Sequence, residues 1–201
     1  MADNIHPIHD RLVRREERER ARGHRGAVVW LTGLSGSGKS TIAAAAERQL
    51  FTQGTFAQVL DGDNVRAGLN GNLGFSLEDR RENIRRIAEV AKLYVNSGAV
   101  VLCSFVSPTR DIRALARDII GAGDFLEVFV NTPLAVCERR DVKGLYVRAR
   151  RGEIRNFTGI DSPYEPPEAP FLDLPTEALS VDEAAARLLA ALRPRLSPPT
   201  P

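Results

Sequence analysis

Short apolar runs alternate with longer amphipathic segments along most of this 201-residue chain. Residues 27–32 (AVVWLT) and 99–106 (AVVLCSFV) are strand-sized and almost wholly apolar, which predicts strands buried on both faces. The longer segments have helical periodicity; in residues 76–98, for example, Ile84 and Ile87 fall on one apolar face. Strands that alternate with helices in this way predict an α/β fold, in which helices cover both faces of a parallel sheet.

The expected elements make up one domain with short additions at its ends. The predicted strands are residues 27–32, 56–64, 99–106, 125–131 and a short one at 171–175. The predicted helices are residues 40–50, 76–98, 111–120, 132–140 and 180–193. We interpret residues 1–25 as a charged helical extension, 26–195 as the domain with a lid at about 139–170, and 196–201 as a flexible tail.

The first 25 residues are dense in charge, with seven arginines between positions 11 and 25. Such a cluster can attract nucleic acid. Glu16, Glu17 and Glu19 interleave with these arginines, however, and opposite charges three or four residues apart on a helix form ion pairs. We therefore expect a solvated helix with local ion pairs and no nucleic-acid partner.

The composition is that of a domain with a sizeable core. Hydrophobic residues make up 43% of the chain, and 28 basic against 26 acidic residues leave a net charge of +2. The N-terminus lacks the apolar core of a signal peptide, and no apolar run approaches a membrane span. Cys103 and Cys137 have no metal-binding spacing, so we expect two buried thiols, with a disulfide between them as the alternative. These features predict a cytoplasmic protein without a membrane partner.

Residues 33–41, GLSGSGKST, fit the spacing G-x-x-x-x-G-K-[ST] of a phosphate-binding loop. Its glycines allow successive backbone N–H groups to converge on one anion. The loop lies between a predicted strand and a predicted helix, and the positive end of that helix would face the phosphates. We expect Lys39 to contact the β- and γ-phosphates and Ser40 to bind Mg²⁺.

Three segments follow predicted strands and should meet in one cleft: the loop at 33–40, residues 61–63 and residues 106–108. Asp61 and Asp63 stand two residues apart on an expected extended strand end, so their side chains should point the same way. Transfer of a γ-phosphoryl group needs charge neutralisation and in-line positioning. One carboxylate would help to hold the metal, while the other would accept a proton from the attacking hydroxyl.

Cations and aromatic residues surround these segments in the sequence. The stretch 139–151 is rich in basic residues, which fits a lid that closes over phosphates; a solvated basic helix is the alternative. Arg66 and Arg80 could face a second anionic group. Phe75 and Phe157 stand among glycines and polar residues, where their rings could enclose a base or cover a local core.

These features together resemble the adenylyl-sulfate kinase (APS kinase) family of sulfate assimilation. The resemblance spans residues from about 10 to 193 and rests on the phosphate loop together with LDGDNVRAGLNGNLGFSLEDRRENIRR, SFVSP and DVKGLYVRARRGEIRNFTGIDSPYEPPEAP. It implies a P-loop nucleotide kinase, usually a homodimer. Such an enzyme transfers the γ-phosphate of MgATP to the 3′-hydroxyl of adenosine 5′-phosphosulfate (APS), which yields PAPS and ADP.

With this resemblance we assign roles to individual residues. The catalytic candidates are Lys39, Asp61, Asp63, Ser107 and Lys143, and the candidates for Mg²⁺ are Ser40 and Asp61. The ATP-binding candidates are Gly33, Leu34, Ser35, Gly36, Ser37, Gly38, Lys39, Ser40, Thr41, Arg139 and Arg150. The candidates for binding the acceptor are Asp63, Arg66, Phe75, Arg80, Asn83, Val106, Ser107, Lys143, Asn156, Phe157 and Thr158.

Some of these assignments carry specific expectations. Two phenylalanines that enclose an adenine explain Phe75 and Phe157 better than local packing does. The family has traditionally been assigned a phosphoserine intermediate at the position of Ser107. Because no activating base lies near Ser107 in the sequence, we expect direct transfer, with Ser107 as a substrate contact.

The chain departs from the family pattern at two places. Thr109 stands where an aromatic residue usually follows Ser-Pro, and Pro175 stands where the family usually has Asp before Thr. The first departure could alter the wall of the cleft, and the second could alter the adenine edge of the ATP site.

Two functions remain as alternatives to an adenylyl-sulfate kinase. One is a P-loop kinase with another small hydroxyl acceptor, and the other is a nucleotide-dependent switch or ATPase module.

Overall fold

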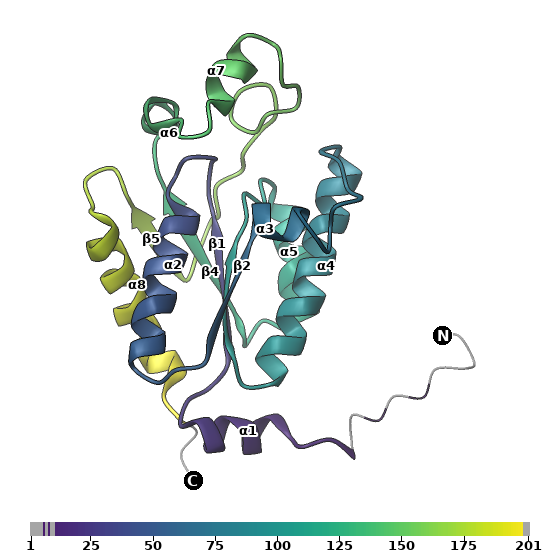
Figure 1. Ribbon diagram of the computed structural model, residues 1–201, viewed down its shortest axis with the longest axis vertical. Coiled ribbons are helices and arrows are strands. Elements are labelled where there is room, and N and C mark those ends of the chain that lie inside the picture. The colour runs from purple at the N-terminus through teal and green to yellow at the C-terminus, as the bar shows by residue number, and fades with distance from the viewer. Residues whose placement is uncertain (1–5, 7, 9–10, 199–201) are drawn as a thin grey trace.

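A five-stranded parallel sheet forms the middle layer of the protein (Figure 1). The computed structural model describes residues 6, 8 and 11–198. The strands are β1 (Ala27–Thr32), β2 (Ala57–Asp61), β3 (Val100–Ser104), β4 (Phe125–Asn131) and β5 (Leu172–Pro175). Their order across the sheet is β2-β3-β1-β4-β5, and each neighbouring pair is parallel. The predicted α/β fold with a parallel sheet is confirmed.

Helices cover both faces of this sheet. They are α1 (Arg15–Arg22), α2 (Lys39–Thr52), α3 (Gly62–Arg66), α4 (Leu77–Asn96), α5 (Arg110–Ile120), α6 (Leu134–Arg140), α7 (Leu145–Arg150) and α8 (Val181–Leu196). Figure 1 shows α2 and α8 on one face and α4 and α5 on the other, with α6 and α7 beyond one end of the strands. None of the helices within the described residues is both long and apolar enough to cross a membrane.

The core is divided by the sheet, which explains why the central strand β1 is buried at every position and apolar at all but its last residue. On one face Val29 and Leu31 of β1 pack in a cluster with residues of α2 and α8. On the other face Val28 and Trp30 pack in a cluster with residues of α4 and α5. Trp30 is fully buried and stacks on Phe105 at 5.7 Å between ring centroids. A strand buried on both faces therefore needs no alternation of polar and apolar residues.

The second strand differs from its prediction in two respects. We expected a buried strand through residue 64, but β2 is an edge strand whose residues are all half-buried. It ends at Asp61, because the Asp61 carboxylate accepts a hydrogen bond from the backbone N–H of Asp63 at 3.0 Å and so caps the short helix α3. Asp63 therefore lies in the first turn of a helix and not on an extended strand end.

The long helix α4 begins and ends as its sequence predicts. The Ser76 hydroxyl accepts a hydrogen bond from the backbone N–H of Asp79, which confirms the predicted N-cap. The predicted apolar face is buried along its whole length, including Ile84, Ile87 and Val95.

Cys103 and Cys137 are both free and buried, so the alternative of a disulfide between them is wrong.

The charged N-terminal segment forms the expected helix, mostly exposed and with a local ion pair between Arg15 and Glu19, but one side of it is also held to the domain. Glu19 of α1 is buried, and its carboxylate accepts hydrogen bonds from Gly26 N and from Arg15 Nε. Arg15 also donates to the Asp124 carboxylate, at 2.7 Å for the Nη2–Oδ1 pair, and these contacts raise the pKa of Arg15. The helix is thus fastened to the end of the sheet opposite α6 and α7 (Figure 1).

The two chain ends extend beyond the part that the structure describes. Residues 1–5, 7 and 9–10 of the predicted extension and 199–201 of the predicted tail lie outside the described residues. Within the described residues, α8 ends at Leu196, so this helix is longer than the prediction, which ended it at residue 193. The segment predicted as a lid contains α7 and otherwise consists mainly of turns and loops.

Candidate active site

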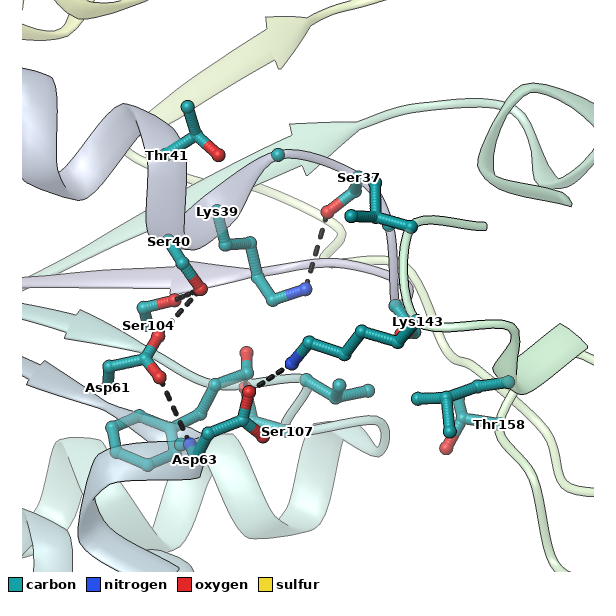
Figure 2. Close-up of a pocket in the computed structure, with 18 of the residues that line it drawn as sticks. Ser37, Lys39, Ser40, Thr41, Asp61, Asp63, Ser104, Ser107, Lys143 and Thr158 are labelled. Atoms are coloured by element: carbon teal, nitrogen blue, oxygen red, sulfur yellow. Dashed lines mark hydrogen bonds and ion pairs between the residues drawn. The ribbon is translucent and has the colours of Figure 1, made fainter. Parts of the chain in front are cut away.

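One cavity of about 1060 Å³ opens beyond the carboxyl ends of the strands. Its walls come mainly from five parts of the chain: the phosphate loop, α3 with the start of α4, residues 104–108 after β3, the lid, and residues 176–184 between β5 and the start of α8. Figure 2 shows Lys39 and Ser40 on one side of it and Asp63 and Lys143 extended toward each other. The predicted convergence of the segments that follow β1, β2 and β3 is therefore confirmed.

The phosphate loop connects β1 to α2 and requires glycine where it passes close to other backbone. A Cβ on Gly33, whose φ is 153°, would lie 2.6 Å from the carbonyl oxygen of Val130. A Cβ on Gly36 would lie 3.1 Å from the carbonyl oxygen of Cys137, again with a positive φ. Both glycines thus allow the loop to pack against β4 and α6 while its backbone curves around the cavity.

Lys39 is the first residue of α2 and is buried at the base of the cavity. Its ammonium donates hydrogen bonds to the Leu34 carbonyl at 2.7 Å and to Ser37 Oγ at 3.3 Å. Burial lowers the pKa of Lys39 to about 8, because removal from water disfavours the charged form. A phosphate anion in the loop would supply the missing counter-charge and favour the ammonium.

Ser40, Asp61 and Ser104 form a chain of oxygen atoms next to Lys39 (Figure 2). Ser40 Oγ donates to Asp61 Oδ2 at 2.6 Å and lies 3.1 Å from Ser104 Oγ. Within the described residues no group of three or more His, Cys, Asp or Glu side chains could hold a metal by itself. This donor set fits Mg²⁺, which prefers hard oxygen atoms and uses one or two protein ligands together with substrate phosphates.

Asp63 and Lys143 form an ion pair across the mouth of the cavity (Figure 2). Asp63 comes from α3, Lys143 comes from the turn before α7, and both side chains are exposed to solvent. The pair joins the lid to the wall that carries Asp61. Burial lowers the pKa of both Lys39 in the phosphate loop and Arg66, and the charge of Asp63 acts against this shift, so this carboxylate lies within electrostatic reach of both.

A group of cations and aromatic rings lines the opposite wall. Arg66 lies over the ring of Phe75, with its guanidinium carbon 4.4 Å from the ring centroid, and Phe75 is 63% exposed. Arg80 donates to Thr158 Oγ1 at 2.8 Å and to the Asn156 carbonyl, so α4 is joined to the lid. Burial lowers the pKa of both Arg66 and Arg80. Two cations held in this way are suited to an anionic ligand.

Phe157 lies in the lid and faces the same cavity. Its ring packs edge-on against Tyr146 of α7, at 5.0 Å between centroids. Tyr146 is fixed in turn, since its hydroxyl donates to the Ser35 carbonyl at 2.9 Å. The lid aromatic residues are therefore tied to the phosphate loop, and Phe157 and Phe75 approach the cavity from different elements.

Ser107 is buried in the wall formed by residues 104–108. Its hydroxyl accepts a hydrogen bond from Trp30 Nε1 at 3.1 Å and donates to the Phe105 carbonyl at 3.3 Å. Its backbone has a positive φ of 37°, and its carbonyl accepts a hydrogen bond from buried Arg113 at 2.8 Å. The partners of the hydroxyl are an indole and a carbonyl, neither of which can take up its proton as a base.

The structure brings most of the residues that we assigned from sequence to the cavity. Those that line it are Ser35, Gly36, Ser37, Gly38, Lys39, Ser40, Thr41, Asp61, Asp63, Arg66, Phe75, Arg80, Asn83, Val106, Ser107, Lys143, Phe157 and Thr158. Those that do not are Gly33, Leu34, Asn156, Arg139 and Arg150. Of these, Gly33 packs closely against Val130, and the Leu34 carbonyl accepts a hydrogen bond from Lys39. The Asn156 carbonyl accepts a hydrogen bond from Arg80.

Arg139 and Arg150, which we expected to bind ATP, do not line the cavity in this structure. Arg139 points to Glu177 and Arg150 donates to Glu138 at 2.6 Å, both away from the cavity lining. Arg140 lines the cavity instead, where it donates to the carbonyls of Ser37 and Thr176. Adjacent residues of a helix point roughly 100° apart, so only the orientation of α6 decides which arginine faces inward.

The two departures from the family pattern leave the walls intact. Thr109 caps α5 without a side-chain hydrogen bond, but the Glu165 carboxylate accepts from Arg110 N at 2.7 Å and takes over that role. Pro175 ends the edge strand β5, where a residue without an N–H is tolerated. The next residue, Thr176, still lines the cavity.

Comparisons with known proteins agree with this geometry. The family model described as adenylylsulphate kinase matches residues 25–175. Adenylyl-sulfate kinases of Bacteroides fragilis and Citrobacter koseri are 57% and 60% identical to this chain; the matches cover 97% and 92% of it, and 96% and 92% of those proteins.

Among solved structures, the APS kinase CysC of Mycobacterium tuberculosis in complex with AMPPNP and APS is 54% identical. The match covers 84% of this chain and 98% of that one, with a TM-score of 0.81. A family model that spans most of the domain and relatives of this identity along nearly the whole length decide the assignment. The chain belongs to the adenylylsulphate kinase family.

Proposed function

We propose that the cavity transfers the γ-phosphoryl group of ATP directly to the 3′-hydroxyl of APS, in one in-line step. The observation that carries this proposal is the position of Asp63, between a phosphate loop with a buried lysine on one side and paired cations and aromatic rings on the other. The Mycobacterium tuberculosis relative, solved with AMPPNP and APS, supports this choice of two substrates.

The phosphate loop binds the donor. Its backbone N–H groups and the N-terminus of α2 face the phosphates, and Lys39 supplies a cation at the base of the loop. Arg140 lies at the same side of the cavity and can approach the donor from α6. These groups neutralise the charge that ADP carries away as the leaving group.

Ser40 and Asp61 would hold Mg²⁺ together with the donor phosphates. Their hydroxyl and carboxylate oxygen atoms are adjacent and belong to the side of the cavity that carries Lys39. The ion, when bound, adds positive charge next to the transferred group and so withdraws electron density from it. In this assignment the Asp61 carboxylate is a metal ligand, and Asp63 is therefore the residue that accepts the proton.

Asp63 acts as the general base. The 3′-hydroxyl oxygen forms a bond to the γ-phosphorus, the bond from that phosphorus to the β–γ bridging oxygen breaks, and the hydroxyl proton passes to the Asp63 carboxylate. For this to happen the hydroxyl replaces Lys143 as the partner of Asp63. The ammonium of Lys143 is then free to pair with the transferred phosphoryl group, which is within the same cavity.

The opposite wall binds APS. Arg66 and Arg80 face the phosphosulfate, whose negative charge also restores favourable surroundings to their partly buried guanidinium groups. Phe75, before α4, and Phe157, in the lid, enclose the adenine from two different parts of the chain. Asn83, Val106 and Thr158 complete this wall.

Ser107 is a wall residue and not a nucleophile. A phosphoserine route needs a base that removes the hydroxyl proton, and the two hydrogen-bond partners of Ser107 cannot do so. Arg113 donates a hydrogen bond to the Ser107 carbonyl and thereby fixes the segment 106–108 against the sheet.

The family resemblance further implies a cytoplasmic homodimer. Sedimentation at micromolar protein concentration tests whether the protein is a dimer.

The test is incubation of the purified protein with MgATP and APS, followed by identification of the products by mass spectrometry. We expect PAPS and ADP in equal amounts, and ADP release that depends on APS. Parallel reactions with gluconate, shikimate and nucleoside monophosphates distinguish a kinase of another hydroxyl acceptor. Slow ADP release that is independent of every acceptor would instead identify an ATPase module and refute the proposal.

A further inference from the structure

Asn70 is a completely buried polar residue that the proposed reaction does not use. It lies in the turn between α3 and α4, where its backbone N–H donates to Val65 O at 2.9 Å and its carbonyl accepts from Leu73 N at 3.0 Å. Its side-chain nitrogen donates to Asn83 Oδ1 at 2.9 Å. Asn70 does not line the cavity, whereas Asn83 does.

Asn70 Oδ1 is the one buried side-chain polar atom without a hydrogen-bond partner within the described residues. If both carboxamides were rotated by half a turn, Asn70 Oδ1 would accept from Asn83 and the Asn70 nitrogen would lose its partner. Both of its N–H groups would then be buried and unpaired, which proteins tolerate less than an unpaired carbonyl oxygen. The observed orientation is therefore the favoured one.

This orientation decides what Asn83 offers to a ligand. Its oxygen is occupied by Asn70, and its nitrogen has no hydrogen-bond partner within the part of the chain that the structure describes. Asn83 thus presents an N–H donor on a wall where Arg66 and Arg80 are donors as well. A ligand that carries several acceptor atoms, such as phosphate oxygens or purine nitrogens, fits these three donors.

We infer that Asn70 is a positioning residue for the acceptor nucleotide: it fixes the carboxamide of Asn83 so that a hydrogen-bond donor faces APS. The inference rests on the proposed function and deepens it. Asn70 acts only through Asn83 and touches no reacting atom. Its loss should weaken the binding of APS and leave the ATP side of the cavity, built from the phosphate loop, unaffected.

The experiment compares Asn70→Ala, Asn83→Ala, their combination and Asn72→Ala in steady-state kinetics with both substrates varied. Asn72 is the matched control, an exposed asparagine of the same turn whose side chain accepts from Arg86 and does not line the cavity. We expect Asn70→Ala to raise the KM for APS about fivefold, the range for one lost hydrogen bond, with the KM for ATP and kcat within about twofold. Asn72→Ala should change none of these values.

The double variant separates a positioning role from a structural one. If Asn70 works through Asn83, the combination should raise the KM for APS no more than Asn83→Ala alone does. An unchanged KM for APS in Asn70→Ala, or an independent additional rise in the double variant, would overturn the inference. If Asn70→Ala does not fold, Asn70→Ser, whose shorter side chain keeps a polar group, is judged by the same criteria. Failure of the wild-type protein to form PAPS would refute the proposed function instead.

Discussion

The two sides of the cavity are built differently. The donor side comes from consecutive residues, 33–41, and its key cation Lys39 is buried and held by contacts within five residues of itself. The acceptor side comes from α3, α4 and the lid, and is joined by contacts between residues far apart, such as Arg80 with Thr158. Its side chains are largely exposed, as Phe75 and Lys143 illustrate.

We infer from this difference that the ATP site is formed before ATP binds, whereas the binding of APS completes the acceptor site. The phosphate loop is pre-organised, so a change there should affect every turnover. The acceptor wall depends on lid contacts, so most changes there should raise the KM for APS and spare ATP binding.

Lys39→Ala should have the largest effect, since it removes a buried cation from the phosphate site. We expect turnover to fall about 1000-fold, the loss that follows removal of one pre-organised charge-stabilising group. Steady-state rates of PAPS formation measure it. Lys92→Ala, at an exposed position of α4, is the control and should be silent; near-normal turnover of the Lys39 variant would exclude this lysine from catalysis.

Asp63→Asn should lower kcat about 100-fold, as loss of a general base does, with little change in ATP affinity. The asparagine keeps the shape of the side chain and still allows α3 to be capped by Asp61. Pre-steady-state transfer rates and ATP titrations measure the two quantities separately. Equal losses in kcat and in ATP affinity would assign Asp63 to the metal or donor site, and would contradict the distinction between the donor and acceptor sides.

Phe157→Ala should raise the KM for APS about tenfold, because stacking of a base on an aromatic ring contributes roughly 1–3 kcal/mol. The KM for ATP should stay within about twofold of the wild-type value, since we assign this ring to the acceptor side, where it packs on Tyr146 of the lid. Phe51→Ala, which removes a 77% exposed phenylalanine of α2, is the control. An unchanged response to APS would remove Phe157 from the acceptor site.

The pH dependence should single out the donor side. Burial lowers the pKa of Lys39 to about 8, so in the free enzyme the ammonium is lost as the pH rises through that value. We expect kcat/KM for ATP to fall about fivefold between pH 8 and pH 9. Bound phosphates favour the ammonium, so kcat at saturating substrates should stay level to higher pH. A level kcat/KM for ATP up to pH 10 would contradict this assignment.

Ser107→Ala should have the smallest effect on turnover, within about threefold of wild type, because direct transfer does not use this hydroxyl. The variant leaves Trp30 Nε1 without its partner, so we expect a loss of about 1–3 kcal/mol in the free energy of unfolding. Urea denaturation measures the stability change. Complete loss of activity in a folded variant would show that a phosphoserine is obligatory.

The donor side was predictable from sequence because its chemistry is local. The glycine spacing, Lys39 and Ser40 are consecutive, and a strand and a helix on either side fix their geometry. The fold was predictable for a similar reason, since short apolar runs rich in β-branched residues, such as 27–32, are typical of buried strands. Periodicity alone supplied the buried face of α4.

The errors arose where long-range contacts decide the outcome. Nothing in the sequence shows that α6 turns Arg140 and not Arg139 toward the cavity, because Arg140 donates to Ser37, 103 residues away. The Asp61 cap that places Asp63 on a helix is an exception, since it is a local contact between residues 61 and 63 and was missed when the strand was extended through residue 64. The partly buried ion pair between Arg15 of α1 and Asp124 was missed because the two residues are more than 100 positions apart. The role of Asn70 likewise depends on a hydrogen bond to another element.

The measurement that tests the central claim most directly is the stereochemistry of transfer from ATP made chiral at the γ-phosphorus with oxygen isotopes. A single in-line step between two nucleotides in one cavity inverts the configuration at phosphorus. We predict inversion in the PAPS that is formed. Retention would mean two successive transfers through a phosphorylated residue, and would contradict the account given for Asp63 and Ser107.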